Sequence, residues 1–316
     1  MKIILILSVV ILTIKKLKYV IYFNLAVGRI RFNIHKFLNR KNKQMLSDED
    51  KIRHQKNIAW LAGQDMEKMS LESEDGLMLS GYYLEADNPK RTILLFHGWR
   101  GSWRWDFADH AKVFHENNCN LLFVDQRAHG ASDGKYIGFG VLEQKDCLSW
   151  IKKIKQLKKQ DIPCFLMGVS MGAATVMMAS NQVEEKDISG IIADSGFVSP
   201  YDMVNIFAHD MMKMKDKTAV DQVNRICVKK AGYDLKQCRT TDSLRNCRVP
   251  ILFVHGSSDK FVPAQRSIQN YDSCASKKDI LLIQGAEHCK SFLKDENGYI
   301  EKLNTFFGWN LQKIPG

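Results

Sequence analysis

The chain has 316 residues, 45% of them hydrophobic, and a formal net charge of +11. This length fits one large domain or one domain with an appendage, and the apolar fraction is ordinary for a soluble globular protein. The charge would suit nucleic acid or an anionic membrane, but the sequence contains no nucleic-acid-binding module and no aromatic residues interleaved with a basic stripe, so no nucleic-acid partner is expected.

Basic residues are concentrated near the N-terminus, where two apolar stretches also occur. The runs from Ile3 to Ile14 and from Tyr19 to Gly28 are separated by Lys15, Lys16 and Lys18. The first run is shorter than the roughly 20 residues that span a bilayer, but with the lysines extending to its surface the two runs could span it or lie in the interface. We therefore expect residues 1–43 to form a membrane-associated segment, and an amphipathic helix packed on the domain is the alternative.

The sidedness of this segment follows from its charges. Six basic residues lie between Arg29 and Lys43, whereas only Lys2 precedes the first run. By the positive-inside rule the rest of the chain faces the cytoplasm; an anchor with the enzyme outside is the alternative. The eight cysteines are scattered without metal-like spacing, so neither a metal site nor a disulfide framework is predicted, and free thiols agree with a reducing compartment. Cys289 lies beside His288, and we interpret it as a chance neighbour.

Secondary structure is predicted from residue 44 onward. Ser47 and Asp50 have the spacing of a capping box and open a helix through Trp60. A hairpin is predicted around residues 74–76, and strands then alternate with helices as in a parallel α/β sheet. The predicted strands are 69–71, 77–84, 92–96, 120–125, 163–169, 190–194, 250–255 and 280–284. The predicted helices are 105–116, 141–159, 171–181, 264–274 and 299–311.

One segment breaks this alternation. Residues 199–245 are expected to be helical and to form a cap inserted between two strands. Met203, Phe207 and Met211 lie on one helical stripe of this segment. Methionine-rich surfaces adapt to irregular apolar shapes, so we expect these three residues to bind an apolar part of a substrate. Packing of the cap onto the domain is the alternative.

The chemistry is expected to centre on Gly168-Val169-Ser170-Met171-Gly172, which lies between an apolar strand and a helix of small residues. This is the context of a nucleophile elbow, a strained turn that exposes the serine hydroxyl above the sheet edge. Its flanking positions leave no room for side chains, which explains the two glycines.

Two further residues complete a candidate triad in the order nucleophile, acid, base. Asp259 and His288 each follow a predicted strand, at the carboxyl edge where open α/β sheets place their sites. His288 would take the proton of Ser170, and Asp259 would hold the imidazole tautomer. Asp194 is the rival acid, while His97, His129 and His255 are less suitable bases because only His288 follows the last strand.

Backbone groups near the elbow would stabilise developing negative charge. The first amide of an oxyanion hole is expected from Trp99, in the loop after the first long strand, and the second from Met171. After the next strand, Asp125 and Arg127 are expected to tie a polar, glycine-rich loop under the elbow. Neither phosphate-binding nor dinucleotide-binding spacing is present, so no cofactor is predicted.

Taken together, these motifs resemble the α/β-hydrolase superfamily, over about Met69 to Leu311. Within it the chain is similar to bacterial serine hydrolases with a short helical cap, some of which carry an N-terminal membrane segment. The resemblance implies an α/β-hydrolase fold, a mostly parallel sheet flanked by helices, for residues 44–316 with the cap at 199–245. It also implies an acyl-enzyme mechanism on carboxylic esters, thioesters or amides without a cofactor.

The function expected from the sequence is therefore a membrane-associated serine hydrolase of modest-sized esters, with its catalytic domain in the cytoplasm. A small-peptide hydrolase and an acyl thioesterase are the alternatives among enzymes. From a different class, the chain could be an inactive membrane scaffold, which the three intact triad positions disfavour. The fold does not by itself identify the substrate, and the sequence predicts no oligomeric state.

Overall fold

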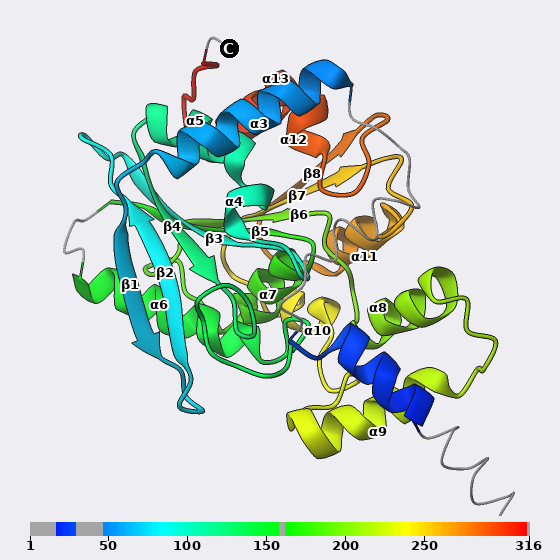
Figure 1. Cartoon of the computed structure of the whole chain (residues 1–316). Helices are drawn as coiled ribbons and strands as arrows, with labels where there is room; N and C mark the ends of the chain where they lie inside the picture. The colour runs from blue at the N-terminus through cyan, green and yellow to red at the C-terminus, as the bar shows by residue number, and fades with distance from the viewer. Residues whose placement is uncertain (1–16, 30–46, 158–161, 315–316) are drawn as a thin grey trace, which may run out of the picture.

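The computed structural model describes residues 17–29, 47–157 and 162–314. Its centre is an eight-stranded sheet with the strand order β1-β2-β4-β3-β5-β6-β7-β8, in which β1 and β2 are antiparallel to their neighbours and the other pairs are parallel (Figure 1). The strands are β1 (Glu67–Glu72), β2 (Met78–Leu84), β3 (Arg91–Phe96), β4 (Cys119–Asp125), β5 (Cys164–Val169), β6 (Gly190–Asp194), β7 (Ile251–Gly256) and β8 (Lys278–Ile283).

Helices cover both faces of this sheet, which explains why β3 to β7 are buried along their whole length. One face is covered by α3 (Asp48–Ala62), α4 (Trp103–Asp106), α5 (Ala108–Glu116), α12 (Ser291–Lys294) and α13 (Glu296–Phe307). The other face is covered by α6 (Glu143–Leu157), α7 (Met171–Ala179), α10 (Thr240–Leu244) and α11 (Gln265–Ser273). Two separate apolar cores result, one on each side of the sheet.

The order of elements predicted from the sequence is confirmed, and the differences are local. The predicted helix 105–116 is two helices, because Ser102 caps a first short one and the chain breaks at Phe107. The last helix begins earlier than predicted, where the Asp295 side chain accepts the Gly298 amide, and ends earlier, at Gly308 with φ +70°. A left-handed residue after a helix is a common C-terminal stop. The predicted Ser47 cap is confirmed by its bond from the Asp50 amide.

The segment between β6 and β7 is helical, as predicted. It contains α8 (Pro200–Ile206), the single π-turn η2 (Phe207–Met211) and α9 (Ala219–Ala231), followed by α10. In Figure 1, α8 and α9 lie outside the sheet and its covering helices. Their buried side chains form a third apolar cluster with the loops at the carboxyl edge of the sheet. We call α8, η2 and α9 the cap.

Residues 17–26 form a helix that lies beside the cap (Figure 1). Phe23, Ala26 and Val27 are buried in the same apolar cluster as the cap residues. This part of the N-terminal segment is therefore packed on the domain, which was the alternative reading of it. The apolar run Ile3–Ile14 lies outside the described residues. No helix within the ranges that the structure describes is long and apolar enough to cross a membrane.

Candidate active site

Ser170 occupies the sharp turn between β5 and α7. Its backbone has φ 54° and ψ −112°, a sparsely populated conformation that is maintained only where the surroundings enforce it. A Cβ atom added at Gly168 would come within 2.1 Å of the Gly172 carbonyl oxygen, and one at Gly172 within 1.8 Å of the Phe96 carbonyl oxygen. The expectation that both flanking positions must be glycine is confirmed.

The structure brings the three predicted triad side chains together, although they come from the ends of three different strands. The Ser170 hydroxyl lies 2.9 Å from Nε2 of His288, and Nδ1 of His288 lies 2.6 Å from Oδ2 of Asp259. The Asp259 side chain is fully buried, whereas that of His288 is 23% exposed. An ionised carboxylate only accepts hydrogen bonds, so His288 carries a proton on Nδ1 and presents the Nε2 lone pair to the serine hydroxyl.

Asp259 is held as an ionised group by its neighbours. Its Oδ1 accepts the amides of Phe261 and Val262 at 2.9 and 2.8 Å, and its Oδ2 lies 3.1 Å from Nε2 of His255. Burial alone would raise the pKa of Asp259, but the charge and hydrogen bonds of His288 and His255 outweigh burial and hold this pKa well below its usual range. The carboxylate is therefore able to stabilise an imidazolium at neutral pH.

The rival acid, Asp194, has different partners. Its Oδ1 accepts the hydroxyls of Ser195 and Ser291 at 2.8 and 3.3 Å, and its Oδ2 accepts that of Tyr299 at 3.3 Å. Burial raises the pKa of Asp194. Of the two candidate acids, Asp259 is the one that is hydrogen-bonded to His288.

The rival bases hold backbone segments in place. Nε2 of His97 accepts the Gln126 amide at 3.2 Å, and Nε2 of His129 accepts the Arg100 amide at 3.1 Å. His255 contacts Asp259 and the Val262 carbonyl through Nε2 and has no exposed surface. These three imidazoles are engaged in the scaffold beneath the site.

In the loop after β3, the amides on either side of Trp99 are engaged. Their partners are Asp106 (Gly98 N–H, 2.7 Å), His129 (Arg100 N–H, 3.1 Å) and, for the next amide, the Gly98 carbonyl (Gly101 N–H, 3.0 Å). The Trp99 amide has no hydrogen-bond partner in the part of the chain that the structure describes. Met171 opens α7, where the first amides of a helix lack partners within the helix. Trp99 and Met171 are the two residues from which an oxyanion hole was expected.

The glycine-rich loop after β4 is tied differently from the sequence prediction. Arg127 does not pair with Asp125; its guanidinium makes two bonds to Asp146 at 2.6 and 2.7 Å and two to Asp75 at 2.8 and 3.0 Å. Asp125 instead accepts the Ala131 amide at 2.8 Å. The reason is that Asp75 and Asp146 come from the β1–β2 hairpin and α6, elements whose approach to this loop is set only by the tertiary fold.

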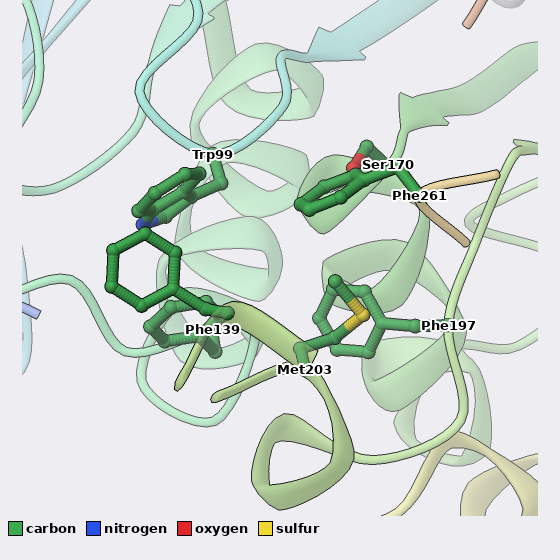
Figure 2. A pocket seen from close by; sticks show the side chains of 7 residues that line it. Trp99, Phe139, Ser170, Phe197, Met203 and Phe261 are labelled. Atoms are coloured by element: carbon green, nitrogen blue, oxygen red, sulfur yellow. The ribbon is translucent and has the colours of Figure 1, made fainter. Parts of the chain in front are cut away.

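A pocket opens directly above the elbow (Figure 2). Its lining contains no charged residue. The residues that line it are Trp99, Phe139, Ser170, Phe197, Met203, Phe207 and Phe261. Two of the three residues expected to contact a substrate, Met203 and Phe207, are in this lining. Met211 is not; it packs against the apolar cluster that the cap forms with the loops at the sheet edge.

Three aromatic lining residues were missed by reasoning from the sequence. Phe197 and Phe261 each lie within five residues of the end of a strand, β6 and β7, so their position at the carboxyl edge was a usable signal. Phe139 lies in a long loop and carries no such signal. The second histidine on Asp259, His255, was also missed, because a contact to a residue four positions away across a turn is not visible in a pattern of strands and helices.

The remaining candidate groups take no part in this arrangement. Burial raises the pKa of the Cys289 thiol well above its ordinary value, so it remains protonated and is a poor nucleophile. All eight cysteines are free. Across residues 17–29, 47–157 and 162–314, no three His, Cys, Asp or Glu side chains gather in a way that could hold a metal ion.

Comparison with known proteins places the chain among hydrolases. Residues 87–231 match the family model described as "Serine aminopeptidase, S33". An uncharacterised Bacillus subtilis protein, YqkD, is 20% identical over 89% of this chain and 92% of its own length. The caffeoylshikimate esterase of Arabidopsis thaliana is 27% identical over 76% of this chain and 87% of its own.

Solved structures share the fold. The Pyrococcus furiosus esterase Pf2001 superposes with a TM-score of 0.65 at 18% identity, over 80% of this chain and 92% of that one. Est1E of Butyrivibrio proteoclasticus, solved with ferulic acid bound, has a TM-score of 0.57 at 21% identity, over 75% and 97% of the two chains. Strand order, elbow, family match and structural neighbours lead to one conclusion: this chain is a hydrolase with the α/β-hydrolase fold.

Proposed function

We propose that this hydrolase cleaves carboxylic esters with small apolar groups, through a Ser170–His288–Asp259 triad and an acyl-enzyme intermediate. The observation that carries the proposal is the continuous hydrogen-bonded chain from Asp259 through His288 to a strained, nearly buried Ser170 at the floor of an apolar pocket. A serine hydroxyl needs an adjacent base to act as a nucleophile at neutral pH, and His288 is placed to be that base.

The reaction proceeds in two halves. The Ser170 oxygen attacks the ester carbonyl carbon while His288 takes the serine proton on Nε2, and the resulting imidazolium is stabilised by Asp259. The tetrahedral intermediate collapses, the bond to the alcohol oxygen breaks, and His288 returns the proton to that oxygen. A water molecule, activated by the same imidazole, then attacks the acyl-enzyme and releases the acid.

The negative charge of both tetrahedral intermediates falls on the former carbonyl oxygen. We assign its stabilisation to the backbone amides of Trp99 and Met171. The amides next to Trp99, those of Gly98, Arg100 and Gly101, are already engaged. Fixed amide dipoles that need no reorganisation are effective at this task, and the loss of one such donor typically costs about 10²–10³ in turnover.

The pocket lining supports an uncharged, apolar group on the substrate. In Figure 2, Met203 of the cap lies beside Phe197. Phe207 of the cap packs edge-on against Trp99, with ring centroids 5.3 Å apart, so the cap and the loops at the sheet edge both line the pocket with apolar groups. Buried charges need partners, and the lining offers none to a carboxylate or an ammonium. The Arabidopsis relative is a caffeoylshikimate esterase, and Est1E was solved with ferulic acid bound. Caffeoyl and feruloyl esters are therefore reasonable first members of a substrate screen.

A small-peptide hydrolase is the second candidate, and it is favoured by the description of the matching family model. An aminopeptidase has to bind the ammonium group of its substrate, which calls for a carboxylate in the pocket. The uncharged lining weighs against this activity. A thioesterase would use the same groups as an esterase and is separated from it only by substrate tests. An inactive scaffold would have no need for an assembled triad.

The proposal is tested by labelling with a fluorophosphonate, which phosphonylates activated serines, and by a panel of p-nitrophenyl esters of increasing acyl length. Wild type should react and Ser170→Ala should not. Matched amide and thioester substrates, including aminoacyl p-nitroanilides with a free amine, separate esterase from peptidase and thioesterase. Wild-type protein that is folded but neither labelled nor active on any substrate would refute the proposal.

We further propose that the apolar and basic N-terminus holds the enzyme at a membrane with the catalytic domain, residues 44–316, on the cytoplasmic side. The Ile3–Ile14 run, the following basic residues and the eight free thiols support this. Deletion of residues 1–14, which leaves the packed helix 17–26 intact, should move the enzyme from vesicle pellet to supernatant. Equal sedimentation of both forms would contradict the proposal.

A further inference from the structure

We propose that residues 17–29 are part of the active site, a strap that holds the oxyanion loop and the cap in their working positions, and that Arg100 is the positioning residue through which it acts. The inference rests on the proposed function of Ser170 and Trp99. Three walls of the pocket are all contacted by one short segment, residues 17–29, that lies far from each of them in the sequence.

The first wall is the loop that carries Trp99. Its indole Nε1 donates to the Ala26 carbonyl at 2.9 Å. The neighbouring Arg100 donates through Nη2 to the carbonyls of Asn24, Leu25 and Gly28 at 3.3, 2.6 and 2.9 Å. The last carbonyls of a helix lack hydrogen-bond donors within it and carry partial negative charge. A guanidinium at this end supplies the donors and the positive charge that balances them. Arg100 thus fastens the oxyanion loop to the end of the strap helix.

The second wall is the cap. Phe23, Ala26 and Val27 of the strap are buried in one cluster with Met203 and Phe207, the two cap residues in the pocket lining. At the other end of the strap helix, Lys18 and Tyr19 both bond to Asp216, in the loop between η2 and α9. Both side chains of the ion pair are partly exposed, and such a pair contributes little by itself. The buried apolar contact is therefore the main attachment of the cap to the strap.

The third wall is the loop that carries Phe139. The Val27 carbonyl accepts the Ile137 amide at 2.7 Å, and the Arg29 amide donates to the Lys135 carbonyl at 2.8 Å. The Arg29 guanidinium also reaches the carbonyls of Ser132 and Gly130, at 2.6 and 2.8 Å. The end of the strap therefore runs antiparallel to this loop, with a β-bridge between Gly28 and Tyr136.

These contacts matter for function because the first wall supplies a backbone amide to the oxyanion hole. The amide proposed to stabilise the oxyanion belongs to Trp99, one residue before Arg100. Interactions made only in the transition state affect turnover rather than ground-state binding. A misplacement of about 1 Å in such a group can cost about a hundredfold in rate. Loosening the strap should therefore lower kcat and leave KM nearly unchanged.

The test compares Arg100→Gln, Arg100→Lys and the matched control Arg104→Gln. Arg104 lies a few residues further along, in α4, and stacks on Trp103 rather than on the strap. We expect Arg100→Gln to lower kcat for a p-nitrophenyl ester by about 10- to 100-fold with KM within about threefold. Arg100→Lys should recover part of the loss, since an ammonium still matches the helix end. Arg104→Gln should behave as wild type.

A purely structural role is excluded by a transition-state analogue. A trifluoromethyl ketone adds the Ser170 oxygen at its carbonyl carbon and places an oxyanion in the hole, so its Ki should rise by the same factor as kcat/KM falls. If Arg100→Gln does not fold, Trp99→Phe carries the test, because it removes the bond to Ala26 and keeps both the aromatic wall and the backbone amide. Unchanged kcat and Ki in a folded variant, or a rise in KM alone, would overturn the proposal.

Hydrogen exchange separates this proposal from the proposed function. In Arg100→Gln, backbone amides of residues 17–29 and 97–101 should exchange faster than in wild type, and this needs no turnover. A wild type without esterase activity would remove the proposed function while the exchange data still tested the strap. Wild-type exchange rates in the variant would refute the strap even if the esterase assignment stood.

Discussion

The substitution Asp259→Asn offers the most discriminating test of the proposed triad. In the wild type, Oδ1 of Asp259 accepts two backbone amides and Oδ2 faces Nδ1 of His288. An asparagine would keep its single oxygen on the amides, because leaving two buried N–H groups unpaired is costly. Its NH₂ group would then face His288. That nitrogen of the imidazole would have to become an acceptor, which moves the proton to Nε2.

The expected loss follows from this change of tautomer. With a proton on Nε2, the imidazole faces the Ser170 hydroxyl with a donor and cannot act as its base. Where the orienting carboxylate of a triad is replaced in this way, kcat falls by about 10⁴. This corresponds to about 5.4 kcal/mol at 1.36 kcal/mol per factor of ten. KM should change little, since the side chain does not line the pocket.

The assay is single-turnover labelling by a fluorophosphonate together with kcat for an ester, both per folded molecule. Asp194→Asn is the matched control, because Asp194 is equally buried but bonds to Ser195, Ser291 and Tyr299. It should lower the melting temperature and leave kcat within a few-fold of wild type. The reasoning is refuted if Asp259→Asn keeps more than about a tenth of wild-type turnover, a loss far smaller than a wrong tautomer causes.

The lowered pKa of Asp259 also predicts how the stability of the protein changes in acid. The folded-state pKa of Asp259 lies below the unfolded value of about 3.9. A depressed pKa contributes stability that is present in full above roughly pH 5 and is lost as the pH falls below about 4 toward the folded value. The free energy of urea unfolding should therefore fall more steeply with acidification in wild type than in Asp259→Asn. Parallel curves would contradict the assignment.

The remaining predictions concern the scaffold and the pocket. Arg127→Met should destabilise the fold by about 3–5 kcal/mol, because it leaves the buried Asp146 carboxylate unpaired; urea unfolding measures this, and the double variant with Asp146→Leu should recover most of the loss. Gly172→Ala should abolish soluble expression or ester turnover, since its Cβ would fall 1.8 Å from the Phe96 carbonyl oxygen; an active, normally stable variant would be incompatible with the elbow geometry. Met203→Ala should shift the preference in the p-nitrophenyl ester panel toward longer acyl chains, by about tenfold in relative kcat/KM.

Much of the site was accessible from the sequence because its signals are local. The elbow at Ser170 is recognisable from two glycines, an apolar strand before them and small residues after them, all within a dozen positions. Asp259 and His288 could be placed because strands and helices alternate, so that each residue just after a strand lies at the same edge of the sheet. Strand order and topology in the structure agree with this reading.

The tertiary structure decided which side chains meet. Only it distinguishes Asp259 from Asp194, since both follow strands and differ in which loop approaches them. It also pairs Arg127 with Asp75 and Asp146, replaces Met211 by Phe139, Phe197 and Phe261 in the pocket, and brings residues 17–29 onto the oxyanion loop. Turns and periodic faces are set by interactions within a few residues, and a sequence displays them. Partners from 19 positions apart, as in Arg127 and Asp146, to 118 apart, as in Ser170 and His288, are chosen by how the layers pack, and that choice is made only when the chain is folded.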